Sequence, residues 1–563
     1  MKFSEMKYQR PDEEVVQVKY TELADSVKGC KTLEKTVDLL LEHEKLLSEY
    51  QSMEAIAYIR HSVDTTNEAY EKEQEFFDSY SPQFEQLRQN FYKALMDSPF
   101  LPQLKEELGE LFFKNIEISF KAFSPEIIDL IQKENQLVTE YQKLLASAQI
   151  EFDGKTLNLS QLRAYQEDAD EKVRKTAYEK TGGFFNEHSQ RLDEIYDELV
   201  RIRTEQAARL GYKNYVELGY YRMQRNCYTP EMVKVFRDQT AKDLIPVIDL
   251  IKQNQAKRIG KKSLKLYDDS CLFLNGNPKP KGTPDEILQN GRKMYRKMSK
   301  TTGEFIDYML GNGLMDVLSK KGKAGGGYCT FIPKYKAPYI FANFNGTSGD
   351  VDVLTHEAGH AFAAYVSKDM EILESASPTL ETCECHSMSM EFFAWPWQEL
   401  FFKEEASKYR TMHLESALSF IPYGVLVDEF QHIVYENPEY TPQQRKGAWL
   451  ELEKKYRPYL DLKGIPFFEN GGGYQRQSHI YSSPFYYIDY CLAQTIALQF
   501  WIKNQEDHGK AFESYLEFVE KAGTETYVDI VKDSGLDSPF EDGTMKKISE
   551  TVTMWLKENE TAQ

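Results

Sequence analysis

The stretch DVDVLTHEAGHAF, residues 350–362, holds two histidines four positions apart, with a glutamate directly after the first. Its apolar residues recur at helical spacing, and Asp350 is a suitable N-cap. Because each residue of a helix turns by about 100°, His356 and His360 share one face. The stretch therefore predicts a helix that offers two imidazoles to one metal ion, with Glu357 beside them. The alternative is a pair of buried histidines with satisfied hydrogen bonds.

A catalytic zinc needs a third protein ligand and one open position. The third histidine of an H-E-x-x-H-x-x-G-x-x-H pattern is absent, because Ala363 and Val366 occupy those places. Candidates lie just downstream, in SASPTLETCECHSMSMEFFAWP (375–396), which predicts a second helix after Pro378. A carboxylate leaves zinc electrophilic and suits hydrolysis better than a thiolate does. The candidate groups at helical spacing or close by are Glu381, Glu384, Glu391, Cys383, Cys385 and His386.

The composition is ordinary for a globular protein, with 41% hydrophobic and 28% charged residues among 563. A formal net charge of −20 argues against a nucleic-acid partner, since phosphate binding needs a basic surface. No apolar run is long enough to predict a membrane span, and the first residues do not resemble a secretory signal. The seven scattered cysteines do not resemble a disulfide framework. We therefore expect a cytoplasmic protein with reduced thiols and no obligate protein partner.

The first half of the chain predicts amphipathic helices almost throughout, at 32–63, 83–98, 124–152 and 168–211. Glycine- and proline-rich breaks follow at 264–286, 322–349 and 464–487. The second break contains two strand-like runs, YCTFI and PYIFANF, directly before the histidine pair. These patterns predict a mainly α fold with one small β-sheet beside the H-E-x-x-H helix.

The catalytic half of the chain resembles the oligoendopeptidase F family of zinc oligopeptidases, within the thimet-oligopeptidase-like superfamily. The residues that carry the resemblance are GTSGDVDVLTHEAGHAF, ASPTLETCECHSMSMEFF and HIYSSPFYYIDY. The N-terminal half has the length and the amphipathic helical patterns expected of this family. The resemblance implies a two-lobed helical ellipsoid with a deep substrate channel. It divides the chain into an N-terminal helical lobe at 1–190 and a zinc metallopeptidase domain at 191–563.

The resemblance also implies one Zn²⁺ per chain, held by His356, His360 and Glu384. Seven residues further on, Glu391 is interpreted as a carboxylate that orients one of the ligand imidazoles. Cys383 flanks the third ligand, as does Cys385, so we expect thiol reagents to impair activity.

A second set of residues implied by the resemblance binds the transition state. It comprises His479 and Tyr490, together with Tyr486 or Tyr487, and the sequence leaves open which of the last two takes part. A helix that begins near Phe485 would place phenol groups on one face.

The predicted activity is zinc-dependent hydrolysis of internal bonds in short, unfolded oligopeptides. Glu357 would act as the general base toward a zinc-bound water and pass the proton to the leaving amine. Residues 338–344 are expected to form the sheet edge along which the substrate lies. The glycines at 325–327 and 471–473 lack the Lys-Ser/Thr of a phosphate loop and predict loops that close over the peptide. Two alternatives stay open: a zinc carboxypeptidase or other exopeptidase, and a non-catalytic peptide-binding protein.

Overall fold

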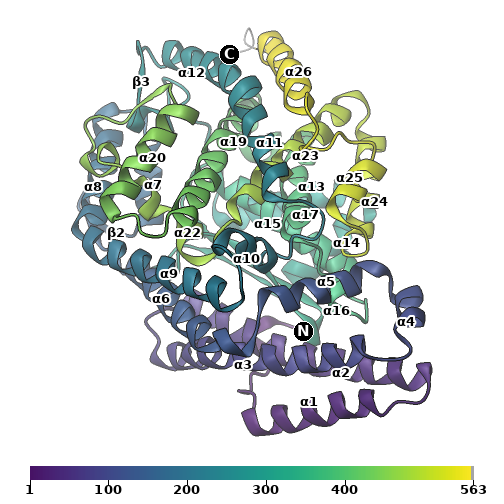
Figure 1. The fold of residues 1–563 in the computed structure, drawn as a ribbon. Helices are drawn as coiled ribbons and strands as arrows, with labels where there is room; N and C mark the ends of the chain where they lie inside the picture. Colours follow the sequence, from purple (N-terminus) through teal and green to yellow (C-terminus); the bar gives the residue numbers. More distant parts are fainter. Residues whose placement is uncertain (560–563) are drawn as a thin grey trace.

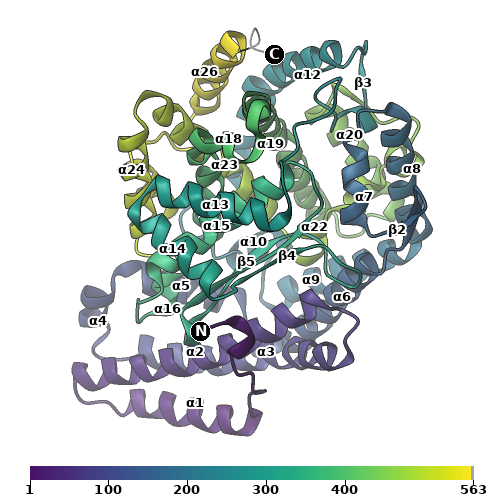
Figure 2. The same cartoon turned by 180° about the vertical axis from the view of Figure 1, so that it is seen from behind.

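Helices dominate the computed structural model, which describes residues 1–559 (Figure 1). The first three, α1 (Glu13–Lys28), α2 (Leu33–Val63) and α3 (Glu68–Met96), lie side by side at one end of the molecule, as both ribbon views show (Figures 1 and 2). The remaining chain forms a larger body above them. The predicted mainly α class is confirmed.

The remaining helices are α4 (Leu101–Leu108), α5 (Glu110–Ala122), α6 (Ile128–Ala146), α7 (Leu159–Gln166), α8 (Glu171–Glu187), α9 (Ser189–Arg209), α10 (Tyr215–Arg222), α11 (Pro230–Gln239), α12 (Ile245–Arg258), α13 (Pro284–Met298), α14 (Lys300–Gly311), α15 (Gly349–Ser367), α16 (Leu373–Ala376), α17 (Leu380–Phe393), α18 (Glu399–Phe402), α19 (Ala406–Glu436), α20 (Pro442–Tyr456), α21 (Pro466–Glu469), α22 (Ser478–Ser482), α23 (Tyr487–Glu506), α24 (His508–Lys521), α25 (Tyr527–Asp533) and α26 (Thr544–Asn559). The segment predicted at 168–211 is two helices, α8 and α9, with His188 between them.

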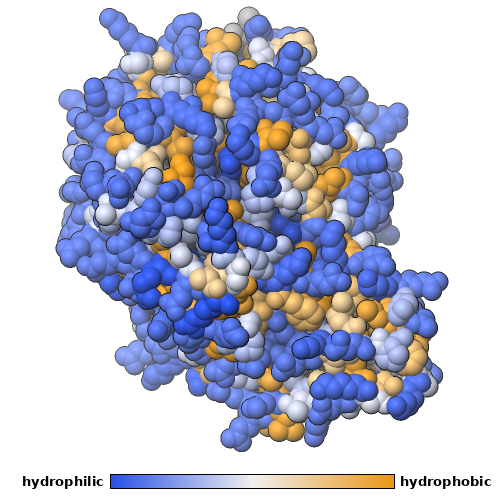
Figure 3. Space-filling model, viewed as in Figure 1, coloured by the Kyte–Doolittle hydropathy of each residue, from blue (hydrophilic) through white to orange (hydrophobic). Residues whose placement is uncertain are grey.

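One apolar cluster runs through the molecule, from Met6 to Val552, so the N-terminal helices share their core with the rest of the chain. The predicted boundary near residue 190 stays a prediction. The surface in Figure 3 is mostly hydrophilic, with small scattered apolar groups, which agrees with the high charge content. No helix in the described part of the chain is long and apolar enough to cross a bilayer.

The sheet predicted beside the H-E-x-x-H helix is present and has three strands, β4 (Met315–Leu318), β5 (Tyr328–Ile332) and β6 (Ala337–Phe344). Its order is β4-β6-β5, with β6 parallel to β4 and antiparallel to β5. Two smaller pairs also form: β1 (Ile150–Phe152) with β2 (Lys155–Leu157), and β3 (Leu264–Lys265) with β7 (Leu460–Asp461). The chain passes from β6 through a short turn into α15.

The expectation that residues 338–344 form the sheet edge is wrong. They belong to β6, which pairs with a strand on each side and is buried at all but one position. The nearly continuous apolar run APYIFANF is what a central strand requires, because both of its faces are covered. The edge strands are β4 and β5, and β5 is the one whose residues line the cavity described below.

Helices α15 and α17 approach each other unusually closely at Gly359. A Cβ atom placed there would lie 2.5 Å from the Cα of Ser387 and 2.7 Å from the carbonyl oxygen of His386. Both obstacles are backbone atoms, which cannot move aside without displacing α17. Glycine is therefore required for the two helices to meet.

Replacing this glycine tests the close approach. We expect Gly359→Ala to destabilise the protein by about 2–3 kcal/mol or more, because overpacking against backbone forces the helices apart. Gly447→Ala is the matched control, since a Cβ at that helical position meets no atom within 4 Å. Thermal unfolding measures both. A Gly359→Ala protein as stable as the control variant would contradict the argument.

A buried carboxyl pair joins the N-terminal helices to α16. Glu44 on α2 accepts a hydrogen bond from the backbone amide of Leu373, at 2.8 Å, and faces Glu374. Burial, and then the charge of Glu374, raises the pKa of Glu44 to about 9. These two carboxyls and His43 offer ligand atoms within 4.8 Å of one another, but the Arg88 guanidinium lies 3.8 Å from Glu374. Because the Arg88 guanidinium already balances part of the charge of these carboxyls, a proton shared between Glu44 and Glu374 accounts for their closeness better than a bound metal does.

The pair predicts a pH-dependent stability. The Glu44 carboxyl ionises near pH 4.5 in the unfolded chain but keeps its proton to about pH 9 in the folded protein. The free energy of unfolding is therefore highest below pH 4.5 and falls as the pH rises from 4.5 to 9. Glu44→Gln should flatten this decline and raise the Tm at pH 8 by about 1 °C, the effect of roughly 1 kcal/mol in a chain of this length. Glu42→Gln, at an exposed position of α2, should leave the decline in place. Identical pH profiles for parent and Glu44→Gln would refute the shared proton.

Candidate active site

The turn between β6 and α15 fixes the start of the H-E-x-x-H helix. Asp350 accepts hydrogen bonds from the amides of Asn345, at 2.8 Å, and Gly346, at 2.9 Å. The expectation that Asp350 is the N-cap is wrong: the helix begins at Gly349, and Ser348 occupies the cap position without a side-chain cap bond. The carboxylate instead holds the preceding turn against the helix, which sets the direction in which α15 leaves the sheet.

Three predicted metal ligands come together between α15 and α17. The Nε2 atoms of His356 and His360 each lie 3.3 Å from Oε2 of Glu384. Ligand atoms at about 2.0–2.1 Å from a tetrahedral zinc lie roughly 3.3 Å apart, so the spacing fits this metal. Although burial opposes ionisation, the two imidazoles hold the pKa of Glu384 well below its usual range. The three residues therefore offer a preformed donor set with a charged carboxylate.

Glu357 lies beside this triplet without joining it. Its side chain is buried, Oε1 lies close to Gly327 on the segment before β5, and Oε2 has no hydrogen-bond partner in the described structure. Burial raises its pKa. A buried carboxylate with an unpartnered oxygen is costly unless a ligand or water meets it. The arrangement is that of a base facing a substrate space.

The other candidate ligands do not converge with this triplet. Glu381 is buried, accepts a hydrogen bond from Thr379 at 2.6 Å, and has its pKa raised by burial to about 7. Cys385 and His386 are buried, and burial lowers the pKa of the imidazole to about 3. Cys383 lines the cavity next to the triplet but does not belong to the group whose ligand atoms converge.

A chain of hydrogen bonds holds the imidazole of His356 in place. Glu391 joins His356 Nδ1, at 2.7 Å, to His413 Nε2, at 2.8 Å. The indole nitrogen of Trp395 in turn donates to His413 Nδ1, at 3.2 Å. The expected contact between Glu391 and a ligand imidazole is present, whereas the sequence reasoning missed His413 and Trp395. Nothing in the sequence singles them out except their place in apolar stretches.

The indole decides the tautomers along this chain. An indole N–H can only donate, so His413 accepts at Nδ1 and carries its proton on Nε2. That proton goes to Glu391, which also accepts the Nδ1 proton of His356. His356 therefore turns Nε2 toward Glu384 and the metal position, and this nitrogen would bind the metal once its proton has left.

A second chain of hydrogen bonds ends at Tyr490. Tyr423 donates to Gln477 Oε1, at 2.8 Å, and the Gln477 amide nitrogen lies 2.9 Å from His479 Nδ1. His479 Nε2 then lies 3.2 Å from the Tyr490 hydroxyl. Burial lowers the pKa of His479 to about 4, so the ring is neutral at pH 7. Because the Gln477 amide donates to Nδ1, the ring carries its proton on Nε2 and donates from there. Tyr490 thus accepts from the histidine and keeps its own proton for another partner.

The structure separates the two neighbouring tyrosines. Tyr486 lines the cavity and donates to Oε1 of Glu384, at 2.5 Å, whereas Tyr487 packs against Phe420 outside it. The helix begins at Tyr487, two residues later than expected, because Phe485 has a positive φ of 69°. This left-handed residue redirects the chain and turns Tyr486 toward the metal ligands.

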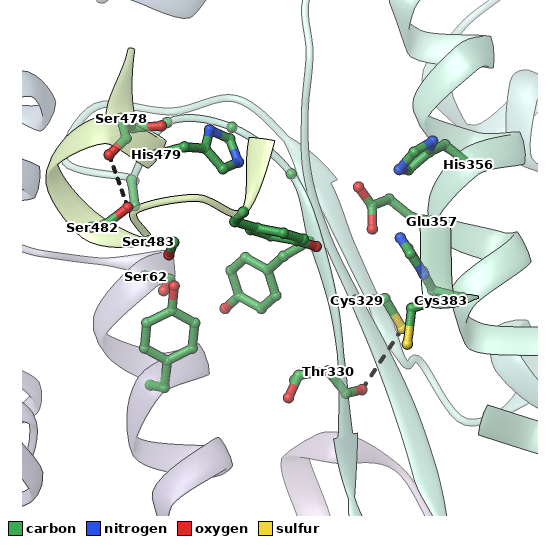
Figure 4. Close-up of a pocket in the computed structure, with 18 of the residues that line it drawn as sticks. Ser62, Cys329, Thr330, His356, Glu357, Cys383, Ser478, His479, Ser482 and Ser483 are labelled. Atoms are coloured by element: carbon green, nitrogen blue, oxygen red, sulfur yellow. Dashed lines mark hydrogen bonds between the residues drawn. The ribbon is translucent and has the colours of Figure 1, made fainter. Parts of the chain in front are cut away.

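The three predicted metal ligands, Glu357, His479, Tyr486 and Tyr490 face one cavity of about 770 Å³. Figure 4 shows His356 and Glu357 on one wall and His479 on the other, with the strand that carries Cys329 and Thr330 between them. The cavity wall also includes α2, through Tyr58 and Ser62. Of the two glycine clusters, the one at 325–327 lines the cavity. The one at 471–473 instead packs against Trp449, Phe467 and Lys446, so the expectation of a closing loop there is wrong.

Comparison with known proteins identifies the family. Residues 290–550 match the model of peptidase family M3, and residues 3–123 match the peptidase M3 N-terminal domain. A solved structure of PZ peptidase A with inhibitor 2 is 48% identical, with 99% of both chains covered and a TM-score of 0.98. The chain belongs to peptidase family M3. The comparison with curated proteins gives no match.

Two further solved structures are similar to this M3 peptidase. One is described as a "putative oligoendopeptidase F from Bacillus anthracis str. Ames"; it is 45% identical over 99% of this chain and 98% of that one, with a TM-score of 0.93. The oligoendopeptidase-F from Enterococcus faecium is 16% identical over 98% and 99%, with a TM-score of 0.60, and shows the shared fold alone. The family resemblance predicted from the sequence is confirmed, and the chain is an enzyme of the metallopeptidase class.

The hydrogen bonds from Trp395 through His413 and Glu391 to His356 predict an effect on the metal affinity of this M3 peptidase. Trp395→Phe keeps a ring but removes the donor to His413, so we expect zinc to bind about tenfold more weakly, as when a partner of a ligand is lost. Competition with a chelator measures this without relying on activity. Trp397→Phe is the control, because this residue lies two positions away and takes no part in these hydrogen bonds. Equal zinc affinity in the two variants would contradict the role of Trp395.

Proposed function

We propose that this M3 peptidase is a zinc-dependent endopeptidase that cleaves internal bonds of short, unfolded oligopeptides. The observation that carries the proposal is the buried, unpartnered carboxylate oxygen of Glu357 beside three convergent metal ligands. A cavity of about 770 Å³ between helical walls suits an extended peptide and excludes a folded domain.

The edge of β5 supports binding of an extended substrate. One side of this strand pairs with β6, and its residues Tyr328–Phe331 line the cavity. An extended peptide can pair with such an edge through main-chain hydrogen bonds. Because Gly327 lies against Glu357, a bond placed near the start of β5 would meet the base.

In the proposed reaction Glu357 takes a proton from the attacking water and delivers it to the nitrogen of the leaving amine. His356, His360 and Glu384 would hold the zinc, which when bound polarises the scissile carbonyl and increases the acidity of water. The raised pKa of Glu357 suits a group that accepts a proton and later releases it.

The two tyrosines take different roles in this proposal. The Tyr490 oxygen accepts a hydrogen bond from His479, and its hydroxyl would donate a hydrogen bond to the oxyanion of the tetrahedral intermediate. Tyr486 donates to the Glu384 oxygen that faces away from the imidazoles, so it orients the carboxylate ligand. Burial keeps both phenols protonated by raising their pKa well above the usual value.

We also propose a cytoplasmic location with short oligopeptides as the binding partners. The support is that all seven cysteines are unpaired. Reduced thiols are usual in a reducing compartment.

The experiment compares the parent with Glu357→Gln on an end-blocked, internally quenched peptide of about ten residues, roughly 33 Å when extended. We expect the parent to cut an internal bond, and Glu357→Gln to lose about 10³-fold in kcat while retaining zinc, the usual loss for a missing base. Glu371→Gln, at an exposed position, is the control for loss of one charge.

Product analysis and metal content decide between the outcomes. A zinc-loaded parent that leaves the blocked peptide intact but trims an unblocked one would show an exopeptidase. A parent that binds both peptides and cuts neither would show a peptide-binding protein.

A further inference from the structure

A second chamber opens from the catalytic cavity along the free edge of β5. It has a volume of about 520 Å³ and lies between α2, α3 and α6 on one side and β5 and α16 on the other. The two cavities share lining residues, namely Tyr58, Thr330, Phe331, Ala376 and Ser377. A chain lying along β5 would therefore pass from one cavity into the other.

Two carboxylates line this second chamber, Glu54 on α2 and Asp78 on α3. Ser81 donates to Glu54, while Gln74 and Thr139 donate to Asp78 at 2.8 Å each. These hydrogen-bond partners are neutral, and Arg88, the cation that acts on Glu54, is bound to Glu85 and lies outside the chamber lining.

No lysine or arginine is among the chamber's lining residues in the described chain. Burial raises the pKa of both carboxyls, so a cation arriving between them would relieve an unfavourable desolvation. The chamber therefore favours a positively charged guest over a negative one.

The direction of β5 determines which end of a peptide reaches the chamber. The strand starts beside Glu357 at Gly327 and runs toward Phe331 and the second chamber. A peptide paired antiparallel to β5 would place its amino-terminal part there, and a parallel one its carboxyl-terminal part. A terminal carboxylate would be repelled by Glu54 and Asp78, whereas an ammonium group would be attracted. The charge of the chamber thus selects the antiparallel direction.

We propose that the second chamber binds an ammonium group from the amino-terminal part of the substrate. Both the α-ammonium and a lysine side chain have the required chemistry. From Gly327 to Phe331 the strand advances four residues, or about 13 Å. The ammonium group then lies about three to five residues before the scissile bond. This inference rests on the proposed function and adds the substrate feature that sets the cleavage position.

A peptide series tests the proposal on the parent enzyme. Internally quenched peptides of one sequence carry a free or an acetylated amino terminus at two, four, six or eight residues before the cleaved bond. We expect the free form to have a KM about tenfold lower, equivalent to about 1.4 kcal/mol, at four residues and little advantage at eight. A third arm, acetylated with lysine at the same position, tells a side-chain ammonium from the α-ammonium.

Variants then assign the effect to the chamber. In Glu54→Gln and in Asp78→Asn the ratio of the two KM values should fall toward one, whereas Glu75→Gln, an exposed carboxylate on α3, should keep the parent's ratio. Equal KM values for free and acetylated peptides in the parent, or a ratio that survives both chamber variants, would overturn the inference but leave the proposed function standing. Failure to cut any peptide would overturn both.

Discussion

The contact between α15 and α17 at Gly359 is the constraint on which the rest of the site depends. Two histidines on one helix define only an edge of a coordination tetrahedron, and the third corner has to come from another element. Because glycine lets the backbones touch, Glu384 reaches the same distance from both imidazoles. A side chain at this position would widen the gap by more than a metal bond can absorb, since ligand distances vary by only about 0.2 Å.

Separate chains of hydrogen bonds hold the side chains on the two sides of the cavity, and the first begins at a group that can only donate. The indole of Trp395 is a donor without an acceptor, and it fixes His413, Glu391 and His356 in turn. Opposite it, the chain through Gln477 ends at Tyr490. The orientation of the polar groups on both sides is therefore set before the substrate arrives, which is the preorganisation that electrostatic catalysis requires.

The sequence predicted what depends on local periodicity and failed where tertiary contacts decide. The i, i+4 spacing was enough to place His356 and His360 on one face, but several residues of α17 could have supplied the third ligand. Only the family resemblance pointed to Glu384, because a contact between two helices leaves no periodic signal. Similarly, the choice between Tyr486 and Tyr487 turned on the left-handed backbone of Phe485, which no propensity predicts for phenylalanine. The apolar run of β6 could have been recognised as a central strand, so that error was avoidable.

The free edge of β5 has a further consequence outside catalysis. An unpaired strand on an open surface invites pairing with other chains and is a common start for aggregation. Here the N-terminal helices wall it in, because Tyr58 and Ser62 of α2 face the same cavity. This enclosure keeps copies of the protein from adding a strand to the sheet at β5. Under the proposed function the same helical wall would also restrict which peptides enter, so a change that opened it would affect aggregation and substrate selection together.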